Sequence, residues 1–297
     1  MAGREPIVIS EEQLRLDIVE VGRRLWARGF VASNDGNISV RIGPDRLLMT
    51  PASVSKGFMA PDMMVITDLK GRLIAGAPGR KASSEIQMHL VAYRERPDVG
   101  AVVHAHPPLS TGFAVAGIPL DRAVLAEVVT TLGSIPIAEY GTPSTPEFAE
   151  TVAPYVKRYD GLLLANHGAL ALGPDLFGAY YKMETIEHFA RISLVARMLG
   201  REHLLSQDEV NRLQGLRDHY GIRSPAPVCP LPDANTDPLD PACQVVIAPD
   251  APGEQLVADS SVAAGSSVSV GTGGEIRLTY AQLTELIDEA VKELAKR

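Results

Sequence analysis

Hydrophobic residues follow two different periods between residues 10 and 220. They recur three or four positions apart in three stretches, which predicts helices from Ser10 to about Gly29, from Ser84 to about Arg94 and over Leu176–Leu199. Short apolar runs predict strands between these helices, at Asn37–Arg41, Arg46–Thr50, Met64–Thr67, Ala101–His104 and Gly161–Ala165. Because helical and extended segments alternate along the chain, we expect an α/β domain.

The C-terminal part of the chain has a different texture. Residues 222–274 are rich first in proline and then in glycine and serine, which predicts a linker between a domain at 1–221 and a final segment at 275–297. That final segment is predicted to form an amphipathic helix from Thr279, with one apolar stripe made of Leu283, Leu286, Ile287, Ala290, Val291 and Leu294. Such a stripe needs a cover, either the chain's own domain, a second subunit or another protein. The long spacer in front of it favours a tethered docking peptide.

Composition and charge narrow the class of protein. The 297 residues carry 28 Lys and Arg against 36 Asp and Glu, a formal net charge of -8. An acidic chain without a basic block argues against binding to nucleic acid or to an anionic membrane. The chain has only two cysteines, no apolar run near 20 residues and an N-terminus unlike a signal peptide. Together these features predict a cytoplasmic protein.

The first candidate for chemistry is a pair of histidines at the end of a predicted strand. His104 and His106 are two residues apart, so their side chains lie on one face of an extended chain. This spacing alone is as often incidental as functional. His167 follows a second buried strand, and two adjacent strand ends would place three imidazoles around one divalent ion such as Zn²⁺.

A second group of residues suits the binding of an anion and includes a candidate catalytic carboxylate. Ser84 with Gln87 has the spacing of a capping box, which by itself indicates only the start of a helix. The same helix end, with the hydroxyls of Ser83 and Ser84, also suits a phosphate. The Gly36–Asn37 turn offers further close approach of the backbone and an amide donor. Glu85 would then stand beside the metal as ligand, general base or both.

Four motifs together resemble the class II aldolase/adducin family, over about residues 11–221. They are His104-Ala105-His106, Asn166-His167-Gly168, Ser83-Ser84-Glu85 and the run from Ser33 to Val40. The resemblance implies a three-layer α/β/α domain with a central, mainly antiparallel sheet. It implies a C4 homotetramer whose active sites lie between neighbouring subunits, with one Zn²⁺ per subunit held by His104, His106 and His167. It assigns substrate phosphate to Gly36, Asn37, Ser83 and Ser84, and metal binding or proton transfer to Glu85.

The activity that the resemblance implies is aldol cleavage of L-fuculose or L-rhamnulose 1-phosphate to dihydroxyacetone phosphate and lactaldehyde. No lysine stands in an obvious Schiff-base context, which favours a metal as the electron sink, with Glu85 returning a proton. Alternatives within the fold are a phosphopentulose epimerase, a decarboxylase and an Fe(II) oxygenase. Epimerases of the family carry aspartate where Glu85 stands. A non-catalytic, adducin-like module would lack the metal-binding set.

The chain departs from the family pattern at several positions. The family's Thr-Pro-Thr-Gly phosphate loop is replaced by Thr50-Pro51-Ala52-Ser53, where Ser53 and Lys56 are candidates to compensate. A family tyrosine on the aldehyde side falls near Leu125. A second one matches Tyr220, which is either a catalytic group for a neighbouring subunit or a surface aromatic before the linker.

The C-terminal extension resembles the encapsulation peptides of enzymes that are packed inside bacterial microcompartments. The resemblance implies a shell protein as the partner of the helix at 275–297. Confinement suits the chemistry, because lactaldehyde is small, diffusible and reactive.

Overall fold

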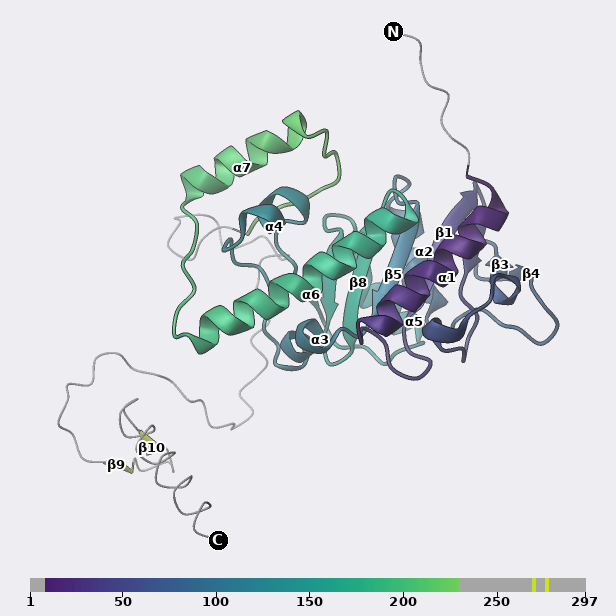
Figure 1. The fold of residues 1–297 in the computed structure, drawn as a ribbon, viewed down its shortest axis with the longest axis horizontal. Coiled ribbons are helices and arrows are strands. Elements are labelled where there is room, and N and C mark those ends of the chain that lie inside the picture. Colours follow the sequence, from purple (N-terminus) through teal and green to yellow (C-terminus); the bar gives the residue numbers. More distant parts are fainter. Residues whose placement is uncertain (1–8, 230–268, 271–275, 278–297) are drawn as a thin grey trace. The chain divides into compact units, whose positions relative to one another are not determined.

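The computed structural model describes residues 9–229, 269–270 and 276–277 (Figure 1). The chain divides into two compact units, residues 1–246 and 247–297. Among the described residues, no helix combines the length and the apolar character that a membrane span requires.

The second unit contains one small strand pair. Strand β9 (Ser269–Val270) lies antiparallel to β10 (Ile276–Arg277), with Ile276 opposite Val270. These strands occupy parts of the segments predicted as linker and docking helix. The helix predicted from Thr279 lies outside the described residues.

An eight-stranded sheet forms the centre of the first unit. Its strand order is β4-β3-β2-β1-β5-β8-β7-β6, and every neighbouring pair is antiparallel except β6 and β7. The prediction of a central, mainly antiparallel sheet is therefore confirmed. The strands are β1 (Asn37–Gly43), β2 (Arg46–Met49), β3 (Val65–Thr67), β4 (Leu73–Ala75), β5 (Ala101–Ala105), β6 (Ile137–Ala138), β7 (Gly161–Leu164) and β8 (Gly168–Gly173).

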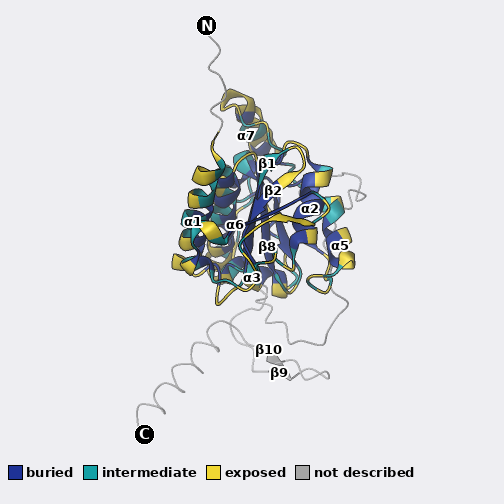
Figure 2. Ribbon diagram, turned by 90° about the vertical axis from the view of Figure 1, so that its right-hand side faces the viewer, coloured by how far each residue is buried: buried dark blue, intermediate teal, exposed yellow. Residues whose placement is uncertain are grey.

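Helices cover both faces of this sheet. The helices are α1 (Glu11–Ala27), α2 (Ile86–Glu95), α3 (Pro108–Val115), α4 (Ala126–Thr131), α5 (Pro146–Val156), α6 (Leu176–Met198) and α7 (Gln207–His219), with two 3-10 turns, η1 (Lys56–Phe58) and η2 (Pro61–Met63). Helices α1, α3 and α6 pack on one face and α2 and α5 on the other, which gives the predicted α/β/α layers (Figures 1 and 2). Helix α7 packs on α4.

Apolar residues on the central strands point alternately into the two helical layers. Val103 belongs to the core beneath α1 and α6, whereas its neighbour Val102 belongs to the core beneath α2 and α5. Leu163 and Leu164 divide in the same way. Both faces of each strand are therefore buried, which explains why these strands appear in the sequence as continuous apolar runs.

The sequence signals at the two ends of α1 have their expected effect. The Ser10 side chain accepts a hydrogen bond from the Gln13 amide at 3.1 Å, and Gly29 follows the helix with φ of +70°.

The first unit continues past the domain end predicted at residue 221. The Ser134 amide donates to the Pro227 carbonyl at 2.8 Å and the Gln214 side chain donates to the Ala226 carbonyl at 2.9 Å.

Candidate active site

The sheet register brings the predicted site residues to one end of its central strands. Strands β1 and β5 pair so that Asn37 lies opposite His104, and β5 pairs on its other side with β8, so that Ala105 lies opposite Ala169. His167 stands in the turn between β7 and β8. The antiparallel order thus places His167 beside the end of β5, which carries His104.

Three imidazoles meet there, as predicted. The candidate ligand nitrogens of His104, His106 and His167 all lie within 4.8 Å of one another. Nε2 of His106 is 3.0 Å from Nε2 of His104. The Glu85 carboxylate completes the group, with Oε2 3.5 Å from Nε2 of His104 and Oε1 3.0 Å from Nε2 of His167.

Burial keeps the imidazoles of His104 and His106 in the neutral form that binds metal. It lowers the pKa of His104 to about 3, although Glu85 opposes the shift, and it lowers the pKa of His106. Nδ1 of His104 lies 2.9 Å from the Ala169 carbonyl oxygen, which can only accept, so Nδ1 carries the proton and Nε2 keeps its lone pair. Neutral imidazoles with converging lone pairs are what a divalent cation requires.

Glu85 stands at the N-cap of α2, the position that we predicted for Ser84. That prediction is wrong, and no side chain caps this helix, because the Glu85 carboxylate turns to Asn37 and the histidines instead. Ser83 accepts a hydrogen bond from the Glu85 amide at 3.3 Å. Burial would raise the pKa of Glu85, but its hydrogen bonds with His167 and with the Asn37 amide hold it well below its usual range. The group is therefore a carboxylate at neutral pH.

This donor set fits a metal ion. Three imidazoles and one carboxylate are ligands of a catalytic Zn²⁺ site and of other borderline divalent ions. The approach of the backbone supports the fit, because a Cβ at Gly168 would lie 2.6 Å from the His106 ring. Nδ1 of His167 is buried without a hydrogen-bond partner among the described residues, so the polar contact of this ring is the one that Nε2 makes with Glu85.

Three backbone segments predicted to bind phosphate lie close to this group. Gly36 has φ of +70°, and a Cβ there would lie 2.8 Å from the His104 carbonyl oxygen, so only glycine fits. Ser53 has φ of +57°, the left-handed conformation that glycine would adopt at this loop position. A β-bridge between Pro51 and Ala82 joins the loop of Ser53 to the loop of Ser83 and Ser84.

The structure gives specific contacts to two residues near these segments. The sequence analysis assigned no role to His89, but its ring contacts Asn37, which in turn donates to Glu85 at 2.8 Å. The spacing of four between Glu85 and His89 on one helix face was the available signal. Lys56 is buried and donates to the carbonyls of Asn34 and Val54 at 2.9 and 2.7 Å, so it ties two of the three segments together. Burial lowers the pKa of Lys56 to about 8.

Tyr220 lies apart from the histidines within the described protomer. It follows the last residue of α7, and its side chain is 64% exposed. Its one ring contact among the described residues is with His219. Within the described residues Tyr220 is therefore an exposed aromatic at the end of α7.

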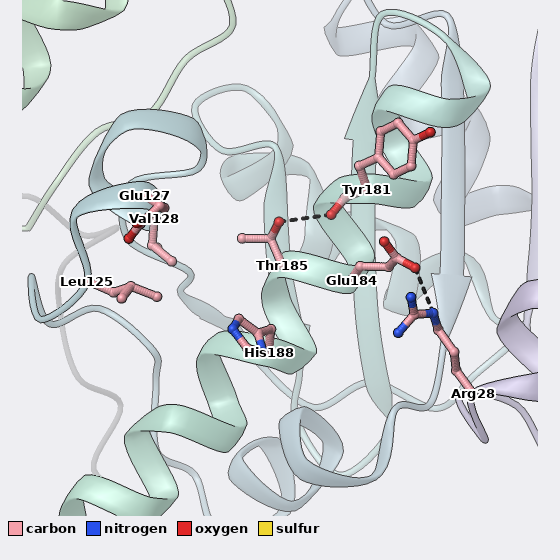
Figure 3. Close-up of a pocket in the computed structure, with 8 residues that line it drawn as sticks. All are labelled: Arg28, Leu125, Glu127, Val128, Tyr181, Glu184, Thr185 and His188. Atoms are coloured by element: carbon pink, nitrogen blue, oxygen red, sulfur yellow. Dashed lines mark hydrogen bonds and ion pairs between the residues drawn. The ribbon is translucent and has the colours of Figure 1, made fainter.

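A separate pocket of about 520 Å³ lies between α4, α6 and the end of α1 (Figure 3). Leu125 and His188 line it, and an ion pair of 2.7 Å between Arg28 and Glu184 crosses one side. None of the histidines of the cluster and no residue of the three phosphate segments lines this pocket. It is therefore distinct from the candidate metal centre.

Several proteins of known activity are similar to this chain. An L-fuculose phosphate aldolase of Methanococcus maripaludis is 32% identical over 183 residues, covering 62% of this chain and 97% of the relative. A 3-oxo-tetronate 4-phosphate decarboxylase of Pectobacterium atrosepticum is 30% identical, covering 65% and 89%. A 5-deoxy-D-ribulose 1-phosphate aldolase of Bacillus thuringiensis is 32% identical, covering 70% and 96%. The names of these relatives thus denote two aldolases of different substrates and one decarboxylase.

The structure and the sequence agree on the family. A solved structure named L-fuculose 1-phosphate aldolase superposes with a TM-score of 0.64 at 27% identity, covering 70% of this chain and 98% of that one. Residues 16–194 match the model of the family described as Class II Aldolase and Adducin N-terminal domain. Since this match spans more than half of the sequence, the chain belongs to the class II aldolase and adducin family.

Proposed function

We propose that the protein is a metal-dependent aldolase that cleaves a deoxy-ketose 1-phosphate, L-fuculose or L-rhamnulose 1-phosphate, to dihydroxyacetone phosphate and lactaldehyde. The observation that carries the proposal is the contact of Glu85 with His104 and His167, at 3.5 and 3.0 Å, beside three backbone segments suited to a phosphate. Aldol cleavage needs an electron sink and a proton carrier side by side, and the histidine cluster and Glu85 would supply them.

The chemistry divides between the metal and the carboxylate. A divalent ion such as Zn²⁺ on His104, His106 and His167, one per subunit, would act as a Lewis acid for the negative charge that develops as the carbon–carbon bond breaks. Glu85 is a carboxylate before the reaction, so it is ready to take a proton from the substrate side and return it to the carbon left by cleavage. Its burial excludes bulk water from that proton transfer.

The substrate phosphate is assigned to the three neighbouring segments. Gly36 and Asn37 offer main-chain amides, and Ser53, Ser83 and Ser84 offer hydroxyls and amides. Lys56 adds a positive charge, which matters in a chain with a formal net charge of -8. Local donors thus compensate for an overall field that repels a phosphate.

The aldehyde side requires a second subunit. In the proposed homotetramer Tyr220 of a neighbouring protomer donates a hydrogen bond to the substrate oxygen that becomes the aldehyde oxygen, while Glu85 takes the proton of that hydroxyl and returns it to carbon. The exposure of Tyr220 in the isolated protomer supports this assignment. We further propose a cytoplasmic enzyme whose segment 275–297 docks on a microcompartment shell protein. That proposal is supported by the apolar stripe of the sequence alone.

Decarboxylation is the second candidate, because a relative of 30% identity is a 3-oxo-tetronate 4-phosphate decarboxylase. Loss of carbon dioxide from a β-keto acid leaves the same kind of carbanion as aldol cleavage, so one metal centre serves both reactions. Epimerisation and Fe(II)-dependent oxygenation have no observation of this structure in their favour, and an adducin-like binding module would not need the cluster of three histidines with a carboxylate.

A substrate panel tests the proposal. Formation of dihydroxyacetone phosphate is measured by a coupled assay with the 1-phosphates of L-fuculose, L-rhamnulose and 5-deoxy-D-ribulose, and carbon dioxide release is measured with 3-oxo-tetronate 4-phosphate. We expect dihydroxyacetone phosphate, loss of activity on chelation and recovery with Zn²⁺. Full activity of metal-free protein would contradict the mechanism, and release of carbon dioxide alone would establish the second candidate.

A further inference from the structure

Four buried side chains connect Glu85 to the interior of the first unit. Nδ2 of Asn37 donates to Oε2 of Glu85 at 2.8 Å, and Oδ1 of Asn37 contacts Nε2 of His89. Nδ1 of His89 lies 2.6 Å from the Ser39 hydroxyl, which lies 2.8 Å from the Tyr93 hydroxyl. We call Asn37, His89, Ser39 and Tyr93 the buried chain. Each of its four members is at most 2% exposed.

The hydrogen bonds of the buried chain have one consistent direction. A carboxylate only accepts, so Asn37 presents its NH₂ group to Glu85 and its carbonyl oxygen to His89. His89 must then donate from Nε2, and as a neutral ring it accepts at Nδ1 from Ser39. Burial lowers the pKa of His89 to about 4, which keeps the ring neutral.

At the Tyr93 end of the buried chain the hydrogen bonds are also donated in the direction of Glu85. The Tyr93 oxygen accepts a hydrogen bond from the Val102 amide, and burial raises the pKa of Tyr93, so the phenol keeps its proton. That proton is donated to Ser39, whose own proton goes to His89. Every member is thus satisfied, and reversing any one bond would leave two buried donors or two buried acceptors facing each other.

The placement of these residues argues against a role in packing alone. Glu85, His89 and Tyr93 are spaced by four on α2, and Asn37 and Ser39 share one face of β1. A polar row of the helix therefore meets a polar row of the strand inside a core that is otherwise made of apolar side chains. Apolar residues would fill this space at lower cost, so the polar rows need another reason.

We propose that the buried chain is a positioning device for Glu85, with His89 as its central positioning residue. Asn37 occupies Oε2 of Glu85, which leaves Oε1, the oxygen that faces His167, to take up and release the proton. The Asn37 side chain then serves the carboxylate, and only its main chain is left for substrate phosphate. This inference rests on the function proposed above for what Glu85 does, but the arrangement itself is testable without it.

The kinetic test compares three variants. His89→Leu removes the donor to Asn37, so its amide is free to rotate, and we expect kcat to fall at least tenfold with KM within twofold of the wild type. His89→Gln keeps a side-chain N–H and should recover most of this loss. Met88→Leu is the matched control, since Met88 precedes His89 on α2 and is equally buried. A His89→Leu enzyme with unchanged kcat would overturn the inference, as would an equal loss in Met88→Leu.

A second readout needs neither metal nor activity. In metal-free protein at pH 6 to 7, nitrogen-15 NMR of the histidine rings should show a neutral Nε2–H ring with a slowly exchanging proton, and this signal should vanish in His89→Gln. A His89 ring protonated at Nδ1 or at both nitrogens would refute the arrangement, whatever the enzyme cleaves. If the wild type cleaved no ketose phosphate yet showed the expected ring, the proposed substrate would fail and the buried chain would stand.

Discussion

Replacing Gly168 by alanine should impair metal binding while leaving the fold intact. Gly168 is the first residue of β8 and follows the candidate ligand His167. An alanine Cβ would lie 2.6 Å from the Ala105 carbonyl oxygen and 2.6 Å from Cδ2 of His106. Both distances are far below van der Waals contact, so either the end of β5 or the His106 ring must move.

The size of the effect follows from which of the two moves. Overpacking of this kind costs about 1–3 kcal/mol of stability, which a domain of this size tolerates. The metal is less tolerant, because ligand distances vary by only about 0.2 Å. Relieving a contact of 2.6 Å requires a larger shift than that. Displaced support of a ligand typically lowers metal affinity about 10- to 100-fold, and we expect a loss of this order.

The assay is competition between the protein and a chromophoric chelator for Zn²⁺, with thermal unfolding measured on the metal-free protein. Gly112→Ala is the control, because Gly112 lies in α3 and no atom stands within 4 Å of the Cβ that it would gain. The control should bind metal like the wild type. If Gly168→Ala did so too, His106 would not be held where the metal needs it and the cluster would not be the metal site.

Four further predictions concern other parts of the mechanism. Glu85→Gln should retain metal and lower kcat by about 10²–10⁴ in the coupled aldolase assay, as loss of a general base does, and a near-normal rate would remove Glu85 from the mechanism. Tyr220→Phe should lower kcat in the assembled enzyme without changing metal content; an unchanged rate would make Tyr220 a surface aromatic. As the pH falls from about 6.5 to 4, the free energy of unfolding of the metal-free protein should decrease, because His89 takes up a proton at higher pH in the unfolded state than in the folded state. Urea titrations should show a loss of up to about 3 kcal/mol, and His89→Gln should abolish this part of the pH dependence. Truncation before Thr279 should leave kinetics unchanged and abolish co-purification with shell protein, whereas loss of the tetramer would assign the segment to oligomerisation.

The sequence predicts five of the eight strands of the sheet and three of the seven helices in the described first unit, where its local signals agree with the tertiary structure. Ser10 caps α1 as expected, and the continuous apolar runs at β5 and β7 match strands that are buried on both faces. The histidine cluster was predictable because His104 and His106 stand two residues apart at the end of one apolar run and His167 follows another. Strands β4, β6 and β8 and helices α3, α4, α5 and α7 were not predicted.

The rest of the site depends on contacts that no local pattern encodes. Ser84 has the sequence pattern of a cap, yet Glu85 occupies the N-cap, because its carboxylate finds stronger partners across the sheet. One of those partners, Asn37, is 48 residues away in the sequence, and the contact between Asn37 and His89 joins residues 52 apart. Only the register of β1 against β5 and the packing of α2 create these contacts.

Lys56 is a second buried polar residue that holds its neighbours in place, here beside the segments proposed to bind phosphate. Lys56 is as buried as Asn37, and its ammonium donates to the carbonyls of Asn34 and Val54. Burial lowers its pKa only to about 8, because Asp35 and Glu85 oppose the shift, so the group is charged at pH 7. Its hydrogen bonds fix the loops while its charge offsets the repulsion that an acidic protein exerts on a phosphate. His89 orients the carboxylate and Lys56 orients the anion site, so the two ends of a sugar phosphate would each meet a group whose geometry is set before the substrate arrives.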